Sequence, residues 1–326
     1  MRASDRLHEI AAIAQYRPGY SPAEDAAHEL AAAWMRAAGL ETSVDSAGNL
    51  HGRRGAARVW SGSHLDSVPT AGRFDGVLGV VAAIESADRL REAPLGVVVF
   101  RAEETGPLGS SRLEELPEAF LELHVEQGPV LESLGEPLGI VTGVAGQARG
   151  VVAFSGRADH AGTTPMEARA DALVEAARFV LHVRECARDG AVATVGAVEV
   201  EPNASNVVPA RVTVSVDARA PTAGQLDALV GAIGFEPGSL VPPVAFSGAP
   251  LEALRRVLPG APELASGAGH DAMVIAAAGV PAAMLFVRSL NGGVSHHPDE
   301  LSSDDDIARG IDALTAALGR LAFHEP

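Results

Sequence analysis

The sequence contains few aromatic side chains and only one cysteine. Phe, Trp and Tyr make up 4% of its 326 residues. The single cysteine, Cys186, excludes an intrachain disulfide, and its place in an apolar helical segment predicts a buried, inert thiol. No apolar run approaches the roughly 20 residues that a membrane-spanning helix needs. The N-terminal segment has scattered charges and no apolar core of a signal peptide. We therefore expect a soluble, cytoplasmic protein.

Basic residues are also in the minority. The chain has 25 Lys and Arg against 42 Asp and Glu, which gives a formal net charge of −17. A surface this acidic repels phosphate backbones and anionic lipids, so we expect neither nucleic acids nor membranes as partners. The hydrophobic content is 47%. A chain of this length and composition can bury one large core or two ordinary ones, which excludes a disordered protein.

Three zones with different patterns follow one another along the chain. In the first, residues 1–144, apolar residues at helical spacing predict helices at 22–38 and 76–90. Buried strands are predicted at 59–63 and 95–100. Near-continuous apolar strands that alternate with helices predict a mostly parallel sheet covered on both faces.

The second zone, residues 145–250, has the element order strand, helix, strand, strand, helix, strand. These elements are expected at 149–156, 169–188, 192–200, 211–219, 223–233 and near Val244. This order matches a ferredoxin-like α+β sandwich. The third zone returns to the α/β pattern, with helices expected at 251–257, 271–278 and 304–321 and a strand at 282–287. An α/β domain split by an inserted α+β domain is the simplest account of the three zones.

Candidate metal ligands follow the predicted strands. His64 comes directly after the strand at 59–63 and offers an imidazole, and Asp66 is placed to accept the hydrogen of the other ring nitrogen. Asp75 opens the next helix, a position from which a carboxylate can bridge two metals. Taken alone, these residues are equally compatible with a loop hydrogen bond and a helix cap.

Two adjacent carboxylates, Glu103 and Glu104, follow the strand at 95–100. Neighbouring carboxylates repel each other and need a cation or a shared proton to coexist. In a metal site, one of them can bind the metal while the other acts as a general base. In isolation, two solvated glutamates are the more common arrangement.

Two further segments carry histidine. His124 lies in an alternating segment at 121–128, and His296 and His297 lie in a glycine-rich loop after the strand at 282–287. Each alone is compatible with a half-exposed loop histidine. Independent accidents would scatter such residues over helices as well, whereas these all follow strands of one domain, where the sites of open α/β sheets form. The candidates contain nitrogen and oxygen ligands without thiolate, which suits two Zn²⁺ or Mn²⁺ ions. The five candidate ligands are His64, Asp75, Glu104, His124 and His296.

The motifs around these residues resemble those of dinuclear zinc peptidases and aminoacylases with a lid domain. They occupy residues 62–69 (GSHLDSVP), 74–80 (FDGVLGV) and 103–106 (EETG). Residues 123–132 (LHVEQGPVLE) are similar to the amidase/hydantoinase/carbamoylase branch, which contains allantoate amidohydrolase, N-carbamoyl-L-amino-acid hydrolase and β-ureidopropionase. Residues 159–166 (DHAGTTPM) and 267–272 (GAGHDA) resemble further signatures of this branch. The resemblance runs from about residue 20 to residue 307, with the motifs in family order.

The resemblance implies a phosphorylase/hydrolase-like fold in which helices sandwich a mixed, mostly parallel sheet. Residues 1–144 and 251–326 would form the catalytic, metal-binding domain, and residues 145–250 an inserted ferredoxin-like lid and dimerisation domain. Two divalent metal ions, zinc or manganese, are implied per subunit. The ligands of one would be His64, Asp75 and His124, and those of the other Asp75, Glu104 and His296.

The same resemblance assigns catalytic roles. Glu103 would be the general base, taking a proton from the attacking water and passing it to the leaving nitrogen. Asp66, which is placed to fix the tautomer of His64, is counted with the catalytic residues. His160 would stabilise the tetrahedral oxyanion, in many relatives from the partner subunit of a homodimer. His296 matches the ligand better than His297 does, because it directly follows Ser295.

The resemblance also implies substrate contacts. Asn206 and Arg219 would bind the substrate carboxylate, for which a guanidinium fork is well suited. Gln127 and His270 would line the substrate site. Two plainer alternatives stay open: Arg219 could pair with Asp217, and the oxyanion histidine could cap its own loop.

The sequence departs from the family pattern near the expected substrate pocket. Only 20 positions (124 − 104) separate Glu104 from His124, the segment after Arg219 is short, and Thr105 interrupts the common Glu-Glu-Gly run. The expected substrate is a small carboxylate-bearing molecule, either an N-carbamoyl amino acid or allantoate. An N-acyl amino acid or dipeptide is the alternative substrate, and a non-catalytic ligand-binding relative is the alternative class. Retention of Glu103 and of all five ligands favours an enzyme.

Overall fold

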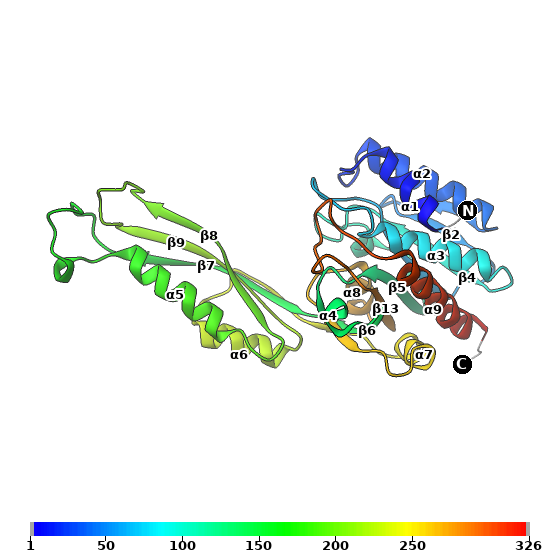
Figure 1. Ribbon diagram of the computed structural model, residues 1–326. Helices are drawn as coiled ribbons and strands as arrows, with labels where there is room; N and C mark the ends of the chain where they lie inside the picture. The colour runs from blue at the N-terminus through cyan, green and yellow to red at the C-terminus, as the bar shows by residue number, and fades with distance from the viewer. Residues whose placement is uncertain (1–2, 324–326) are drawn as a thin grey trace. The chain divides into compact units, whose positions relative to one another are not determined.

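The computed structural model describes residues 3–323, which fall into two compact units. The larger unit consists of Met1–Val144 and Ala245–Pro326, and the smaller of Ala145–Val244. Figure 1 shows the chain coloured by residue number. The second divide lies at residue 244, six positions before the expected boundary at 250. No helix in the described part of the chain is long and apolar enough to cross a membrane.

The larger unit is built on a mixed sheet of nine strands. Its order is β1-β2-β4-β3-β5-β13-β6-β11, and β12 pairs with β6. The strands are β1 (Glu41–Val44), β2 (Leu50–Arg53), β3 (Val59–His64), β4 (Leu95–Phe100), β5 (Ala119–Val125), β6 (Leu138–Val144), β11 (Val244–Ala245), β12 (Glu263–Ser266) and β13 (Ala282–Val287). The central strands β4, β3, β5 and β13 are parallel, whereas β2 with β4 and β13 with β6 are antiparallel. The predicted α/β class with a mostly parallel sheet is confirmed.

Helices cover this sheet because its strands are apolar on both faces. In β4, Val97 and Val99 enter one core cluster, while Val98 and Phe100 enter the other, as the alternation of a strand requires. The helices of the larger unit are α1 (Ala3–Ile13), α2 (Pro22–Ala37), α3 (Val77–Arg89), α4 (Val130–Leu134), α7 (Ala249–Val257), α8 (Asp271–Ala277) and α9 (Asp304–Phe323).

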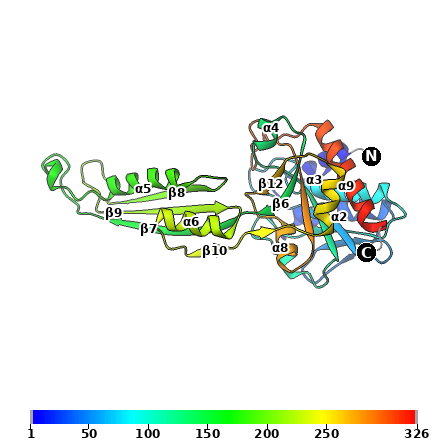
Figure 2. The same cartoon turned by 90° about the horizontal axis from the view of Figure 1, so that it is seen from below.

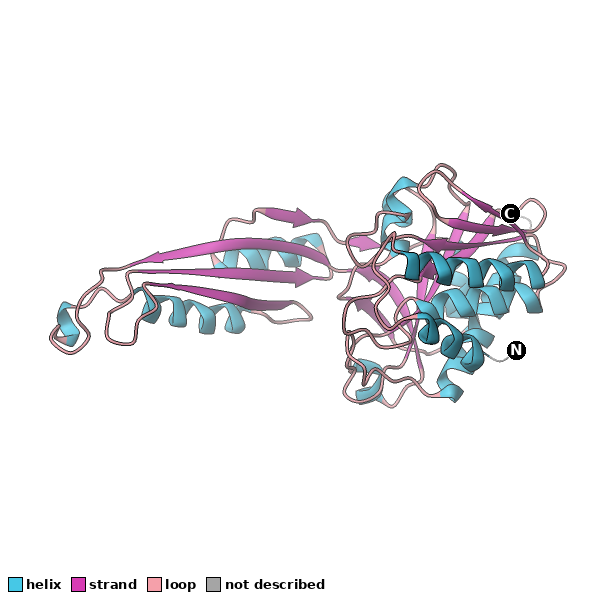
Figure 3. Cartoon of the chain, turned by 90° about the horizontal axis from the view of Figure 1, so that it is seen from above, coloured by secondary structure: helices cyan, strands magenta, loops and turns pink. Residues whose placement is uncertain are grey.

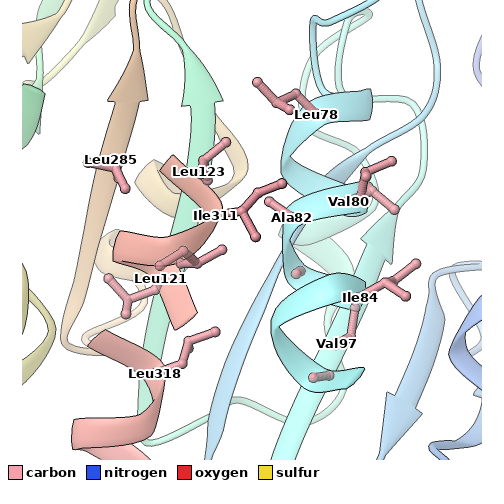
Figure 4. Packing of buried hydrophobic residues seen from close by; sticks show 14 of the residues in the cluster. Leu78, Val80, Ala82, Ile84, Val97, Leu121, Leu123, Leu285, Ile311 and Leu318 are labelled. Carbon is pink, nitrogen blue, oxygen red and sulfur yellow. The ribbon is translucent and has the colours of Figure 1, made fainter. Parts of the chain in front are cut away.

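The larger of the two core clusters lies under α3 and α9. Figure 4 shows Ile84 of α3 and Ile311 of α9 pointing into the cluster that also contains Leu121 of β5. These three side chains are at most 1% exposed. Full burial of one such side chain contributes about 1.5–3 kcal/mol. The two helices therefore cover one face of the central strands, which carry the candidate site at their ends.

The smaller unit has the predicted β-α-β-β-α-β order. Its elements are β7 (Gly146–Ser155), α5 (Ala172–Cys186), β8 (Val192–Glu201), β9 (Arg211–Ala220), α6 (Ala223–Ile233) and β10 (Ser239–Val241). The antiparallel sheet has the order β10-β7-β9-β8, and α5 and α6 cover one of its faces (Figures 2 and 3). This is a ferredoxin-like arrangement.

Two sequence expectations for this unit need correction. Its last strand is β10, whereas Val244, where that strand was expected, belongs to β11 of the larger sheet. Pro242 and Pro243 separate the two strands, since proline has no N–H to donate to a sheet. Cys186 is half-buried at the end of α5 rather than fully buried.

Candidate metal centre

The predicted ligands meet at one edge of the larger sheet. His64 is the last residue of β3, His124 is next to last in β5, and Glu104 follows β4 closely. Asp75 precedes α3, and His296 lies in the loop after β13. Because these four strands are parallel, their carboxyl ends lie at the same edge, where the sites of open α/β sheets form. All five predicted ligands are thus brought together, in two groups that share Asp75: His64, Asp75 and His124, and Asp75, Glu104 and His296.

The carboxylate of Asp75 lies at the centre of the cluster. Its Oδ1 is 3.6 Å from His64 Nε2 and 3.3 Å from His124 Nε2, and its Oδ2 is 3.3 Å from His296 Nε2. Glu104 Oε2 is 3.5 Å from His296 Nε2. These separations exceed the 2.7–2.9 Å of charge-assisted hydrogen bonds. Ligand atoms around a tetrahedral zinc ion stand about 3.3 Å apart, given bonds of 2.0–2.1 Å. The spacing therefore fits cations held between these atoms.

Two histidines present the same ring nitrogen to the centre. His124 Nδ1 lies 2.9 Å from the carbonyl of Val125, and its Nε2 accepts the Gly76 N–H at 3.3 Å. His64 Nδ1 lies 3.3 Å from Asp66 Oδ1. A hydrogen on Nδ1 in both rings turns Nε2 toward the other candidate ligands, as in metal sites whose histidines are oriented by a neighbouring acceptor. At His124 a bound cation would compete with the Gly76 N–H for the lone pair of Nε2.

Asp66 also fixes the loop that carries the two glutamates. Its Oδ1 accepts the Glu103 N–H and its Oδ2 accepts the Glu104 N–H, both at 3.0 Å. Burial alone would raise the pKa of Asp66, but hydrogen bonds with His64 and these two N–H groups lower it. Asp66 is therefore an ionised residue that links His64 to the loop of the two glutamates.

The electrostatics of the cluster favour bound cations. Burial raises the pKa of Glu103 well above its usual range, with His64 opposing the rise and Asp271 adding to it. Burial and then Asp75 raise the pKa of Glu104, whose Oε1 is buried without a hydrogen-bond partner among the described residues. Burial would raise the pKa of Asp75 as well, but the three surrounding imidazoles hold it well below its usual value. Several carboxylates thus share a confined space, and cations would offset their repulsion.

Two predicted substrate contacts lie beside the cluster. Gln127 Nε2 donates to Asp75 Oδ2 at 2.7 Å, so in this structure the amide contacts the central carboxylate. The Oε1 atom of Gln127 is buried and has no hydrogen-bond partner among the described residues. The ring of His270 packs edge-on against His124, with centroids 4.6 Å apart. Burial and then His124 hold the pKa of His270 well below its usual value, so this imidazole is neutral.

The other three predicted site residues belong to the smaller unit. His160 is exposed, and its Nδ1 accepts the Gly162 N–H at 3.0 Å. Asn206 is exposed as well. Arg219 on β9 donates from Nε to Asp217 Oδ1 at 2.9 Å, so the plainer alternative for this arginine, an ion pair with Asp217, is present in the structure. His297 is exposed and lies outside both ligand groups.

Three buried carboxylates near the cluster were not predicted. Glu300 Oε2 accepts the N–H groups of Phe74 and Asp75 at 2.9 and 3.3 Å and so fixes the backbone at the central carboxylate of the cluster. Glu122 accepts from Ser63 Oγ and from the Ala272 N–H. Burial raises the pKa of Asp271 to about 8. Glu122 had a local signal, because it is a charged residue in a segment otherwise typical of a buried strand.

Comparisons with known proteins agree with this geometry. Residues 60–320 match the peptidase family M20/M25/M40. The chain is 34% identical to an N-carbamoyl-L-amino acid amidohydrolase of Geobacillus stearothermophilus, with 99% of each chain covered, and 33% identical to the allantoate amidohydrolase of Escherichia coli (strain K12), with 89% of each covered. The solved structure of a hydantoinase/carbamoylase family amidase from Burkholderia ambifaria superposes with a TM-score of 0.91 at 29% identity, over 99% of this chain and 98% of that one.

The alignment with the relative from Geobacillus is longer than this chain. The alignment with the Geobacillus protein extends over 406 positions, whereas the chain has 326 residues, so at least 80 positions (406 − 326) have no counterpart here.

Proposed function

We propose that this chain, which belongs to the peptidase family M20/M25/M40, hydrolyses a linear amide or carbamoyl C–N bond in a small substrate that carries a carboxylate. Relatives that align over most of their length are named N-carbamoyl-L-amino-acid amidohydrolases and allantoate amidohydrolase or deiminase. The observation that carries the proposal is the pair of ligand groups that share Asp75, at spacings that fit bound cations. The first substrates to test are therefore N-carbamoyl amino acids and allantoate.

Two divalent cations, Zn²⁺ or Mn²⁺, would be held by the two groups, with Asp75 common to both. Bound cations would supply Lewis acidity and neutralise charge that develops on the substrate oxygen. The nitrogen and oxygen donor set suits either metal. The buried, unpartnered Oε1 of Glu104 supports the assignment, since a buried carboxylate oxygen without a partner is costly unless a cation is bound.

Glu103 is the residue best placed to act as general base. It belongs to neither ligand group, yet its Oε2 lies 3.8 Å from His64 Nε2, at the border of the cluster. Burial raises the pKa of this carboxyl group, which makes the carboxylate a stronger proton acceptor than that of an exposed glutamate. Glu103 would accept a proton from water as the water oxygen bonds to the substrate carbonyl carbon. It would then donate that proton to the nitrogen as the C–N bond breaks.

The smaller unit would recognise the substrate and complete the site. Its three candidates are His160 for the oxyanion and Asn206 and Arg219 for the carboxylate, on the basis of the motif resemblance. Two of them are exposed, and Arg219 carries a guanidinium fork that suits a carboxylate. We propose in addition that this unit acts as a lid and that the protein is a homodimer.

A substrate panel tests the proposed activity. Purified protein is reconstituted with Zn²⁺ or Mn²⁺ and incubated with N-carbamoyl-α-amino acids, N-carbamoyl-β-alanine, allantoate and N-acetyl amino acids, while ammonia and free amine are measured. We expect ammonia release from a carbamoyl substrate or allantoate, and two metal ions per chain by elemental analysis. Turnover of N-acetyl amino acids alone would redirect the proposal to an acyl-amino-acid hydrolase.

Substitution of the proposed base supplies the second arm. Glu103→Gln should lower kcat by at least about 100-fold, the range typical of a lost general base, while metal binding persists. Glu136→Gln is the matched control, because Glu136 is an exposed glutamate of the same unit, outside both ligand groups. A chain that binds no metal, or a Glu103→Gln variant with unchanged turnover, would refute the mechanism.

A further inference from the structure

The loop that carries Glu103 and Glu104 is held by side chains from other parts of the chain. Its four consecutive backbone N–H groups, at positions 101–104, all donate to side-chain oxygens. The acceptors in chain order are Asn49 Oδ1 at 3.1 Å, Glu24 Oε1 at 3.0 Å and the two Asp66 oxygens at 3.0 Å each. Asp66 is part of the site motif, whereas Glu24 lies in α2, outside the residues matched to the family.

Helix capping alone does not account for the hydrogen bonds of the Glu24 carboxylate. Ser21 and Glu24 have the spacing of a capping box, and Ser21 Oγ accepts the Glu24 N–H at 3.3 Å. In a capping box the glutamate would accept the Ser21 N–H in return, but that N–H donates to the Pro18 carbonyl. Oε1 of Glu24 accepts instead the N–H of Ala102, more than 70 residues away, and Oε2 accepts the N–H of Tyr20.

The carboxylate of Glu24 is buried and is surrounded by polar and charged partners. The residue is 0% exposed, and burying a carboxylate is costly unless all its contacts are polar or charged. Its Oε2 lies 3.0 Å from Arg101 Nε, in the loop it supports. Arg101 in turn pairs with Asp25 at 2.6 Å, which ties the loop to the first turn of α2 a second time.

The residue that Glu24 holds has a disfavoured backbone conformation. Ala102 has φ +52°, in the left-handed region that residues with a Cβ rarely adopt. Gly19 leaves room for this turn, since a Cβ at position 19 would lie 2.3 Å from the Ala102 Cβ. A strained turn of this kind persists only where the surrounding structure fixes it, and such turns gather at functional sites.

We propose that Glu24 is a positioning residue for the hydrolytic reaction. By accepting the Ala102 N–H it fixes the strained turn after β4, and that turn directs Glu103 and Glu104 into the metal centre. Glu24 itself touches no reacting atom. The inference rests on the roles proposed above for the two glutamates.

The first test separates this role from a general contribution to folding. We expect Glu24→Ala to lower kcat by about 10- to 100-fold, the usual effect of losing an outer partner of a metal site, with KM changed by less than about threefold. Its affinity for Zn²⁺, measured without substrate by competition with a chromophoric chelator, should fall by a similar factor at one of the two sites. Glu29→Ala is the matched control, because Glu29 is an exposed glutamate of the same helix.

The second test asks whether the effect passes through Ala102. Glycine adopts positive φ without strain, so an Ala102→Gly background should need Glu24 less. In a double-mutant cycle, Glu24→Ala should therefore cost several-fold less in kcat and zinc affinity in the Ala102→Gly background than in the wild-type background. If Glu24→Ala does not fold, Glu24→Met replaces it in the same cycle, since methionine fills a similar space and its thioether is only a weak acceptor for the Ala102 N–H.

The outcomes are distinct. Equal effects of Glu24→Ala in both backgrounds, or a folded variant with wild-type kcat and zinc affinity, would overturn the positioning role alone. A wild-type chain that binds no divalent metal would overturn the proposed function instead.

Discussion

Substitution of Gly76 by alanine should damage the metal centre through the backbone. Gly76 follows the central ligand Asp75 and has φ +65° and ψ −49°. The Val77 N–H donates to the Asp75 carbonyl at 2.6 Å, so the three residues form the rare γ-turn with positive φ. A Cβ at position 76 would lie 2.4–2.6 Å from ring atoms of His64. Alanine would thus strain the turn and push a ligand histidine out of place.

The expected magnitude follows from these two effects. Holding a residue with a Cβ in such a backbone region costs about 1–3 kcal/mol, and overpacking a full site costs about 1–3 kcal/mol more. We expect Gly76→Ala to lower the free energy of unfolding of the larger unit by about 2–6 kcal/mol and the zinc affinity by about 10- to 100-fold. Urea unfolding, with and without Zn²⁺, measures the free energy of unfolding, and competition with a chromophoric chelator measures the zinc affinity.

A matched glycine provides the control. Gly231 lies inside α6, and a Cβ there would meet no atom within 4 Å. Gly231→Ala should therefore stabilise its helix by about 0.5–1 kcal/mol, the usual advantage of alanine over glycine. If Gly76→Ala unfolds at the wild-type urea concentration and binds zinc as tightly, the account of the Asp75–Gly76 turn is wrong.

Three further predictions concern groups around the centre. Burial raises the pKa of Asp271 to about 8, so between about pH 4 and 8 the folded, metal-free protein holds a proton that the unfolded chain releases. The free energy of unfolding should therefore fall as the pH rises through this range, by up to about 1.4 kcal/mol per pH unit. Urea unfolding at several pH values measures this slope, and Asp271→Asn should flatten it. Glu300→Ala should lower the free energy of unfolding by about 1–3 kcal/mol and weaken zinc binding, because it leaves the buried Asp75 N–H without its acceptor. Glu300→Gln, measured by urea unfolding and chelator competition, should retain most of the stability and most of the zinc affinity. If His160 acts on the partner subunit of a dimer, mixing inactive His160→Ala with inactive Glu103→Gln should restore measurable turnover, and no recovery in proven mixed dimers would place both residues in one subunit.

The elements that the sequence predicts best are decided locally. α6 and β13 have the predicted bounds, because each is an apolar segment ended by glycine or a polar loop. Short strands such as β2 gave no such signal. Strand β2 contains Gly52, and glycine is a poor strand former. Its missing Cβ leaves space for the Met35 sulfur, which lies 2.8 Å from where that Cβ would be. Packing against α2, which no local pattern reveals, explains the glycine.

The candidate site likewise contains some features that the local sequence predicts and others that depend on distant segments. The grouping of all five candidate ligands could be predicted, since each lies at or after the carboxyl end of a strand at one edge of the sheet. Apart from the contact of Asp66 with His64, the contacts that orient them could not be predicted, because they join distant segments. Glu300 reaches the Asp75 N–H across 225 positions, and Gln127 donates to the Asp75 carboxylate across 52. Hydrogen bonds from backbone N–H groups to side chains depend on the folded path of the chain, so motif spacing does not report them.

The insertion point of the smaller unit has a consequence for how such enzymes diversify. The chain leaves the larger sheet at the end of β6 and returns to it at β11, and these two strands are neighbours, with the Phe246 N–H donating to the Thr142 carbonyl at 2.8 Å. The smaller unit is therefore an insertion whose two ends lie side by side in the larger sheet. Such an insertion can be exchanged, shortened or lengthened without moving any strand that carries a candidate metal ligand. The proposed recognition residues of the smaller unit can then change at a different rate from the candidate metal ligands of the larger unit.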